Sequence, residues 1–317
     1  GQMTFQSSTV SYAARMRFIL FLLVTASALS ATDTFTVASY NVENYFLSPF
    51  GTRKAKSAVS RAKVREAILK IQPDVLALQE IGRRAALDEL LAGLKSKGLS
   101  YPHIEWVQGP DLAIHLVVLS RFPFVARKSH LNVQYALDRQ RFRVSRGVGE
   151  VTIRVNDTYK FTLLNAHLKS KRPVPKASQA EMRLREAREL RLIIEERLKA
   201  DPNANLIVVG DLNDTQDQPP IRTLLGSKAP KLVDLRPCER NGDRAPHLQS
   251  AKFIQRRVAW TSFYWKEDSY SRFDYLIASA GMNRELRREG TLVHAVEDWG
   301  LASDHRLVVG EFFAEER

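Results

Sequence analysis

The chain has a single cysteine, Cys238, in 317 residues, so no disulfide can form within it. The fold must therefore rest on its own hydrophobic core, for which 44% hydrophobic residues are sufficient. No internal repeat and no low-complexity linker interrupts the sequence. These features exclude a disulfide scaffold, a repeat array and a disordered chain, and they fit one large α/β domain.

Several sequence signatures of catalysis and ligand binding are also missing. No Cys/His spacing typical of a zinc site occurs, and neither does a Gly-x-Ser-x-Gly turn that would present a nucleophilic serine. A glycine-rich phosphate-binding loop is absent as well. Any chemistry must therefore come from side chains that are scattered along the chain.

The N-terminal region contains the longest apolar run, Phe18 to Val24, which is too short to span a bilayer comfortably. Arg15 and Arg17 precede it and small residues follow, a pattern typical of a secretory signal peptide. An uncleaved anchor or a core strand are the alternatives. We predict an upstream extension and signal peptide over residues 1–31, a folded domain over 32–317, a secreted or periplasmic location, and no stable membrane insertion after cleavage.

Acidic residues are outnumbered, with 35 Asp and Glu against 48 Lys and Arg, which gives a net charge of +13. Loss of residues 1–31 would remove two arginines and no acid, leaving +11. Such a charge favours polyanionic partners such as nucleic acid, although it also serves solubility. The composition alone does not decide between these two interpretations.

Short β-like runs alternate with helical stretches after residue 33, and this layout predicts mixed sheets combined with helices. The predicted strands cover residues 34–40, 75–78, 114–119, 148–155, 159–165, 206–209, 273–279 and 306–313. The predicted helices cover residues 60–71, 85–97 and 177–200. On the longest helix, we interpret Arg183, Arg185, Arg188 and Arg191 as a solvent-exposed face.

Polar residues with chemical potential lie where predicted strands end or begin, which is where sheet proteins concentrate their chemistry. Asp211 and Asn213 follow an apolar strand and lie two residues apart, so both side chains point to one face of an extended chain. Asp304 and His305 precede the last strand, and a histidine there could donate a hydrogen bond to an oxyanion. Taken alone, each pair is also compatible with an ordinary turn. The remaining strand-end residues of this kind are Asn41, Glu80, His167 and Asp274.

The oxygen-rich character of these side chains favours Mg²⁺ or Mn²⁺ over zinc. Glu80 ends a strand and is a plausible ligand for such a hard metal ion, while Asn41 adds an amide at the end of the first strand. Asp274 could pair with a histidine and fix its tautomer.

The order of the motifs is more specific than any one of them. They are Asn41-Val-Glu, Gln79-Glu80, Ser120-Arg-Phe-Pro123, Asn165-Ala-His167, Gly210-Asp211-Leu-Asn213-Asp, Phe273-Asp274-Tyr and Ser303-Asp304-His305. This series resembles the endonuclease/exonuclease/phosphatase superfamily, which includes pancreatic-type deoxyribonuclease, abasic-site endonucleases, inositol polyphosphate 5-phosphatases and bacterial sphingomyelinases. The resemblance spans about residues 34–314 and implies an α/β four-layer sandwich, in which two packed mixed β-sheets are flanked by helices.

The resemblance also implies roles for the site residues. Glu80 would bind Mg²⁺ (or Mn²⁺) with Asn41 close by, and Asp304 would be a second ligand or an orienting group. Asp211 would orient or activate the attacking water, and Asn213 and His167 would contact phosphate oxygens. His305, held by Asp274, would stabilise the transition state. The histidine at position 167 is the deoxyribonuclease-like and phosphatase-like choice, because abasic-site endonucleases often carry tyrosine there.

The substrate is not fixed by the superfamily. We favour a secreted, monomeric nuclease of low sequence specificity, with Arg146, Lys169 and Lys171 binding substrate phosphates. A phosphatase or phosphodiesterase of small or lipid phosphates is the alternative, and a non-catalytic binding protein is a third possibility. The aromatic stretch from Trp260 to Trp265 is interpreted as a core strand, although it could form a substrate wall.

Overall fold

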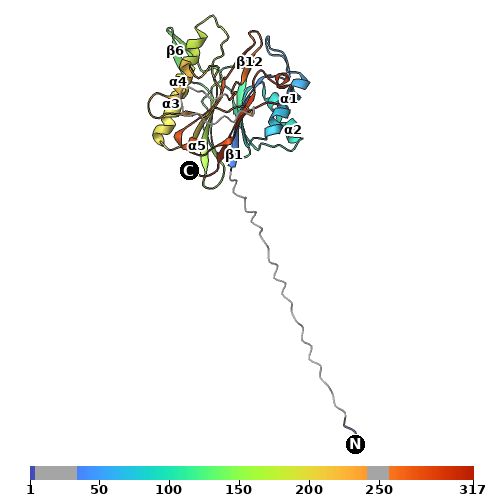
Figure 1. The fold of residues 1–317 in the computed structure, drawn as a ribbon. Helices are drawn as coiled ribbons and strands as arrows, with labels where there is room; N and C mark the ends of the chain where they lie inside the picture. Colours follow the sequence, from blue (N-terminus) through green and yellow to red (C-terminus); the bar gives the residue numbers. More distant parts are fainter. Residues whose placement is uncertain (4–33, 241–256) are drawn as a thin grey trace. The chain divides into compact units, whose positions relative to one another are not determined.

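Two six-stranded β-sheets form the centre of the computed structural model, which describes residues 1–3, 34–240 and 257–317 (Figure 1). The predicted signal segment, residues 1–31, lies outside the described residues except for its first three. The first sheet has the strand order β15 (Leu286–His294), β16 (Leu307–Phe313), β1 (Thr34–Tyr45), β2 (Val75–Ile81), β4 (His115–Ser120) and β3 (His103–Val107). The second has the order β11 (Val233–Asp234), β14 (Asp274–Ala278), β10 (Leu206–Asp211), β9 (Lys160–His167), β8 (Val148–Arg154) and β5 (Phe124–Arg127).

Each sheet contains one parallel pair of strands among antiparallel neighbours. In the first sheet, β1 pairs in parallel with β2, and helix α1 (Ala58–Ile71) connects them. In the second sheet, β9 pairs in parallel with β10, and helix α3 (Gln179–Ala200) connects these two strands. The two sheets are therefore mixed, and each is built around a strand–helix–strand unit whose strands end at the same edge.

Helices cover the outer faces of both sheets, which gives four layers. The first sheet packs against α1 and α2 (Arg84–Lys95) through residues such as Ile68, Leu87 and Leu90. The second packs against α3 and α4 (Pro219–Leu225) through residues such as Leu190 and Ile194. This arrangement confirms the predicted α/β four-layer sandwich. It also explains why the runs starting at Val75 and Leu206 are continuously apolar, because these strands are covered on both faces.

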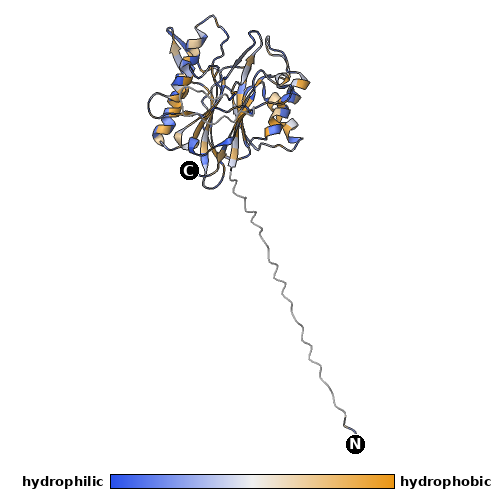
Figure 2. Ribbon diagram, viewed as in Figure 1, coloured by the Kyte–Doolittle hydropathy of each residue, from blue (hydrophilic) through white to orange (hydrophobic). Residues whose placement is uncertain are grey.

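The layer between the two sheets is rich in aromatic side chains. The ring of Phe35 on β1 lies 5.1 Å from that of Phe161 on β9 and 5.6 Å from that of Phe312 on β16, measured between centroids. All three side chains are buried. In Figure 2 orange segments accordingly run along the central strands. This rigid centre fixes the ends of the strands of one sheet relative to those of the other.

In the described part of the chain, two hairpins, one short helix and one 3₁₀ turn lie outside the two large sheets and their main helices. Two hairpins are made by β6 (Gln134–Leu137) with β7 (Gln140–Arg143), and by β12 (Ser262–Tyr264) with β13 (Ser269–Ser271). Helix α5 (Ala280–Arg284) and a 3₁₀ turn, η1 (Trp299–Leu301), complete the set. Within residues 34–240 and 257–317, no helix combines the length and apolar character that crossing a bilayer requires.

The long helix corrects one interpretation from the sequence. Arg188 is exposed as expected, but Arg183 and Arg191 are buried. The Arg183 Nε donates to the Asp214 carboxylate at 2.8 Å, and the Arg191 Nη1 donates to the carbonyl oxygen of Leu224 at 2.9 Å. These guanidinium groups bind α3 to the loop after β10 and to helix α4, so the predicted solvent-exposed arginine face is wrong for these two residues.

Candidate active site

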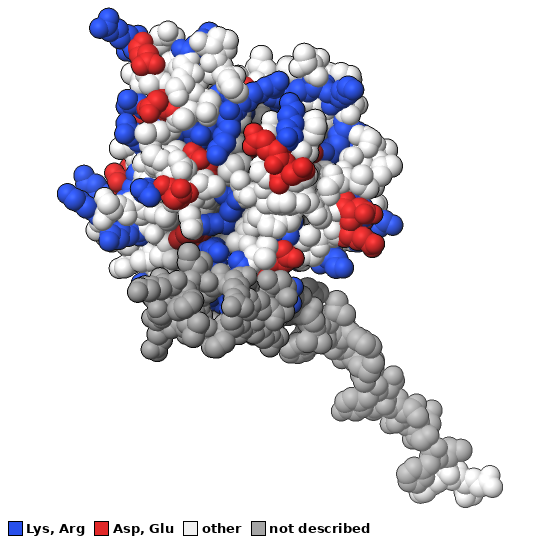
Figure 3. Space-filling view, turned by 45° about the horizontal axis from the view of Figure 1, so that its top comes forward, with Lys and Arg blue, Asp and Glu red and all other residues white. Residues whose placement is uncertain are grey.

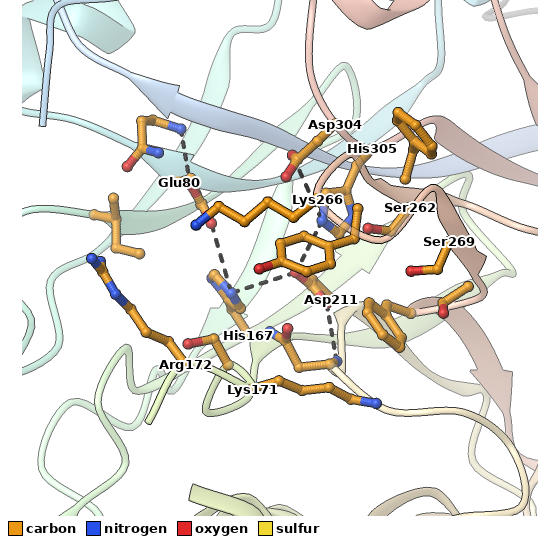
Figure 4. A pocket seen from close by; sticks show the side chains of 18 of the residues that line it. Glu80, His167, Lys171, Arg172, Asp211, Ser262, Lys266, Ser269, Asp304 and His305 are labelled. Atoms are coloured by element: carbon orange, nitrogen blue, oxygen red, sulfur yellow. Dashed lines mark hydrogen bonds and ion pairs between the residues drawn. The ribbon is translucent and has the colours of Figure 1, made fainter. Parts of the chain in front are cut away.

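Asp211, the last residue of β10, is the point on which the other site residues converge. Its Oδ2 atom accepts a hydrogen bond from the Asn41 Nδ2 atom at 2.9 Å. The same oxygen lies 3.5 Å from the His167 Nε2 atom and 3.6 Å from the His305 Nε2 atom. These partners come from β1, β9 and the segment before β16, so both sheets contribute to one cluster (Figure 4).

The environment of Asp211 changes its acidity. Burial raises the pKa of its carboxyl group to about 7, and the neighbouring Asp274 and Glu80 act in the same direction, whereas His305 and Asn41 oppose the rise. Its other oxygen accepts a hydrogen bond from the backbone N–H of Asn213 at 3.0 Å. A carboxyl group with a pKa near neutrality is suited to accept a proton at ordinary pH.

His305 is held by a second carboxylate. Its Nδ1 atom lies 2.7 Å from the Asp274 Oδ2 atom, and both side chains are buried. Burial alone would lower the pKa of His305, but Asp274, Asp211 and Asp304 outweigh it and raise the pKa well above its ordinary value. The imidazole is therefore stabilised in its protonated form, with Nε2 directed to Asp211.

His167 has the opposite electrostatic character. Burial lowers its pKa well below the ordinary value, and Arg146, His305 and Arg53 lower it further. The Nδ1 atom of His167 has no hydrogen-bond partner within the described part of the chain. The site thus combines a neutral imidazole and a protonated one, both close to the same aspartate oxygen.

Glu80, Glu43 and Asp304 form a cluster of three carboxylates at one end of the first sheet. The Glu80 Oε2 atom accepts the backbone N–H of Asn44 at 2.9 Å, and the Glu43 Oε2 atom accepts the N–H of Asp304 at 3.2 Å. Burial, followed by Asp304, raises the pKa of Glu43 to about 7, although Lys56 opposes this. Glu80 has a φ of 66°, a left-handed conformation that is costly outside glycine and is often found at functional sites.

This crowding of carboxylates fits the binding of a hard divalent cation, because a cation would neutralise groups that otherwise repel one another. Within the described residues, one group of three such side chains has ligand atoms within 4.8 Å of one another, namely Asp211, Asp274 and His305. In that group, however, Asp274 and His305 already bind each other. Glu80 and Asp304 are therefore the better candidates for metal ligands.

Asn41 and Asn213 bind protein groups in the structure. The Asn41 Oδ1 atom accepts the N–H of Glu43 at 3.0 Å, and its Nδ2 atom donates to Glu80 and Asp211. Asn41 therefore positions two carboxylates of the site. The Asn213 Nδ2 atom donates to the carbonyl oxygen of Leu168 at 3.0 Å, and Asn213 lines the cavity described next.

A cavity of about 850 Å³ opens above these residues. Arg146 and Lys171 line it, as their predicted role in substrate binding requires, and Arg146 also lies 3.6 Å from the Asp111 carboxylate. Lys169 is not among the lining residues, and its Nζ atom donates to the carbonyl oxygens of Ser170 and Arg172. Figure 3 shows basic side chains gathered on the upper part of this face around a small acidic group.

The aromatic stretch from Trp260 to Trp265 is not a core strand, which corrects the interpretation that the sequence favoured. It enters the β12–β13 hairpin, where the side chains of Tyr264 and Trp265 are 47% and 69% exposed. Phe263 and Tyr264 line the cavity. The alternative interpretation, a substrate wall, agrees with this position.

Several cavity residues were not identified from the sequence. Arg53 and Arg172 add positive charge, and Lys266 extends from the β12–β13 hairpin into the cavity (Figure 4). Arg53 lies in the loop after β1, and Lys266 lies in the turn of a hairpin that the sequence did not predict, so no local pattern separated them from ordinary surface residues. Arg172 belongs to the basic run after His167, which was the one available signal.

Comparisons with known proteins agree with this arrangement. A sequence model described as the Endonuclease/Exonuclease/phosphatase family matches residues 38–305. A search of curated proteins by sequence found no match. The human Nocturnin catalytic domain with bound sulfate anion is similar in structure, with a TM-score of 0.63 and 18% identity over 90% of this chain and 95% of that chain.

Two further solved structures have a similar fold. Truncated TDP2 from Caenorhabditis elegans has a TM-score of 0.59 and 18% identity, over 89% of this chain and 98% of that chain. Sphingomyelinase C from Streptomyces griseocarneus has a TM-score of 0.54 and 19% identity, over 89% of this chain and 100% of that chain. At these identities the likeness concerns the fold.

Proposed function

The chain belongs to the endonuclease/exonuclease/phosphatase family of phosphoester hydrolases, and from this premise we propose that it is a divalent-metal-dependent nuclease of low sequence specificity. The convergence of Asn41, His167 and His305 on one oxygen of Asp211 carries the proposal. Hydrolysis of a phosphodiester requires a proton acceptor for the attacking water and donors for the developing negative charge. This cluster offers both within one cavity.

In the proposed reaction, Asp211 accepts a proton from the water that attacks phosphorus, and the bond from phosphorus to the leaving oxygen breaks. His305, protonated and held by Asp274, donates a hydrogen bond to a phosphoryl oxygen. His167 and Asn213 line the same cavity and would contact the other phosphoryl oxygens. Positioned donors of this kind each contribute about 10²–10³-fold to the rate.

Glu80 and Asp304 would hold Mg²⁺ or Mn²⁺, with Asn41 orienting the carboxylate of Glu80. When bound, the metal supplies positive charge that offsets the charge developing on the phosphoryl oxygens. Burial, followed by repulsion from Asp304 and Glu80, raises the pKa of the neighbouring Glu43 to about 7, and a bound cation would relieve the repulsive part of this rise.

Nucleic acid is the proposed substrate because positive charge surrounds the cavity. The chain carries a net charge of +13, and Arg53, Lys171, Arg172 and Lys266 line the cavity. Phosphate backbones bind to such surfaces largely through charge, which suits low sequence specificity. We further propose that the enzyme acts outside the cytoplasm, on the basis of the signal-like pattern in residues 15–31.

A lipid phosphodiester is the second candidate, and the exposed side chains of Trp265 and Tyr270 favour it, at 69% and 57% exposure. Exposed aromatic residues can rest at a membrane surface. The two candidates differ in salt dependence, because only charge-driven binding to nucleic acid weakens steeply as salt rises.

A substrate panel tests the proposal. Purified protein would be assayed with duplex and single-stranded DNA, RNA, inositol phosphates and sphingomyelin vesicles, each with Mg²⁺ and with chelator. We expect cleavage of nucleic acid that chelator abolishes, and a loss of about 10²-fold or more in kcat in Asp211→Asn. Cleavage of sphingomyelin without cleavage of nucleic acid would reject the nuclease, and equal rates in Asp211→Asn would reject catalysis at this site.

A further inference from the structure

The β12–β13 hairpin forms an aromatic wall beside the catalytic cluster. Phe263 and Tyr264 line the cavity, and Tyr264 remains 47% exposed. The Phe263 ring lies 4.7 Å from that of Tyr270 and 6.5 Å from that of Trp299. These ring contacts hold Phe263 in place. The ring of Tyr264 takes no part in them and is available to a ligand.

The backbone fixes this wall to the catalytic residues. The N–H of Phe263 donates to the carbonyl oxygen of Asp304 at 2.9 Å. The Thr261 Oγ1 atom accepts the N–H of Asp274 at 3.0 Å. The segment that carries Tyr264 is therefore bonded directly to both Asp304 and Asp274, so the ring has a defined position relative to His305.

The same hairpin supplies a cation. Lys266 lines the cavity and extends across it toward Glu80 (Figure 4). Arg172, from the loop after β9, lines the cavity as well. An aromatic face and a cation on one short hairpin, close to the proposed site of phosphate hydrolysis, match a nucleotide, which presents a flat base beside a phosphate.

Two observations narrow the ligand further. Bases inside a duplex are already stacked on their neighbours, so a free ring face suits an unpaired nucleotide. The hairpin turn also contains Glu267 and Asp268, and these carboxylates oppose insertion of the turn into the apolar part of a bilayer. They repel phosphates as well, so the preference for nucleic acid rests on Arg53, Lys171 and Arg172 in the cavity and not on the turn.

We propose that Tyr264 and Lys266 form a subsite for an unpaired nucleotide next to the scissile phosphate, which makes the enzyme selective for single-stranded nucleic acid. The inference rests on the proposed nuclease function. The base stacks on Tyr264, and Lys266 contacts the adjoining phosphate.

Three matched substrates test the subsite: a single-stranded oligonucleotide, its blunt duplex, and a single strand whose nucleotides lack bases. We expect the wild type to have its lowest KM for the base-bearing single strand. Tyr264→Ala should raise that KM by about 5- to 150-fold, as expected when one base no longer stacks on an aromatic ring, and Tyr264→Phe should restore it. Neither variant should change hydrolysis of the base-free strand.

Trp265→Ala is the matched control, because Trp265 lies on the same hairpin, is exposed, and is not among the residues that line the cavity. Its ring lies 5.6 Å from the Lys266 Nζ atom, so any effect on phosphate binding should be equal on the base-bearing and base-free strands, and the ratio of the two KM values should stay at its wild-type value. An equal loss on base-bearing and base-free strands, or no effect of Tyr264→Ala, would overturn the subsite while nuclease activity stands. Absence of cleavage of any nucleic acid would overturn the proposed function and the subsite together, and a loss confined to Trp265→Ala on sphingomyelin vesicles would assign the hairpin to lipid.

Discussion

At the scale of the residue, one carboxylate determines how the site is organised. Asp211 is buried, and its two oxygens together contact Asn41, Asn213 and both histidines. The two imidazoles differ because His305 has a carboxylate partner at Nδ1, whereas His167 faces Arg146 and Arg53. The surroundings of each side chain therefore determine its charge: His305 is a protonated hydrogen-bond donor, and His167 is neutral.

His305 and Asp274 give the prediction at this scale. We expect His305→Ala to lower kcat by about 10²–10³-fold with a smaller change in KM, because the imidazole stabilises charge that develops only in the transition state. Asp274→Asn should also lower kcat, since it removes the carboxylate that accepts from the His305 Nδ1 atom and orients the ring. Steady-state kinetics on an oligonucleotide measure both effects.

A histidine–carboxylate pair outside the cavity is the control. The His130 Nε2 atom lies 2.6 Å from the Glu150 carboxylate, so His130→Ala breaks a comparable pair. Its kcat should equal that of the wild type. A His305→Ala enzyme with a kcat close to the wild-type value would contradict the assigned role.

At the scale of the element, the long helix α3 is attached to the second sheet by polar contacts as well as by its apolar face. Glu150 on β8 is buried and accepts hydrogen bonds from Arg197 on α3 and His130. Burial raises the pKa of Glu150, but hydrogen bonds from His130 and Arg197 lower it more, so the net pKa is below the ordinary 4.5. The ionised form is therefore favoured by folding.

Glu150→Gln should lower the free energy of unfolding by about 1.5–3 kcal/mol at neutral pH, the usual contribution of hydrogen bonds to a charged group. Because the folded-state pKa is lowered, the contribution is complete above the ordinary pKa of 4.5 and is lost as pH falls through the folded-state value. The difference between wild type and variant should shrink under acidic conditions. Urea denaturation at a series of pH values measures it.

Glu196→Gln, on the same helix, is the matched control. Its side chain is 62% exposed and pairs at the surface with Lys128 at 3.2 Å and with Arg197 at 3.6 Å, so the variant should cost less than about 1 kcal/mol. If Glu150→Gln is no more destabilising than Glu196→Gln, Glu150 does not attach α3 to the sheet.

At the scale of the whole molecule, positive charge extends beyond the cavity. The β6–β7 hairpin carries exposed Arg139, Arg141 and Arg143. Its apolar side packs with Val174 and Ala177, in the loop that follows the lysines and arginines beside the cavity. The hairpin thus adjoins the proposed substrate-binding surface and can contact phosphates remote from the scissile one.

Replacing these three arginines by alanine should weaken binding of nucleic acid of any sequence. The slope of log Kd against log salt should decrease by about 1 for each phosphate that an arginine no longer neutralises. Binding titrations with an oligonucleotide at a series of salt concentrations measure the slope, and kcat should remain unchanged.

A matched triple variant on β15 and α5, at Arg284, Arg287 and Arg288, removes the same charge from exposed positions that do not line the cavity. This variant should keep the wild-type slope. If the two triple variants change the slope equally, the effect belongs to net charge and not to the β6–β7 hairpin.

Periodicity in the sequence predicted the central strands and the helices α1, α2 and α3 close to their observed bounds, because elements buried on defined faces leave local patterns. The strands at the sheet edges, β3, β5, β11 and β15, the two hairpins and the short helices α4 and α5 were not predicted, because short or partly exposed elements leave weaker patterns. The position of polar residues at strand ends, and their order along the chain, selected Asp211, His305 and their partners. It did not identify the β12–β13 hairpin as a cavity wall, since aromatic residues occur equally in buried strands.

Contacts among these residues depend on the tertiary structure. Asn41 and Asp211 are 170 residues apart in the chain and are joined because two sheets pack face to face with their parallel strands ending at the same end of the sandwich. The burial of Arg183, the outward position of Tyr264 and the opposite charge states of the two histidines follow from that packing. Each depends on neighbours from distant segments, and no local pattern records such neighbours.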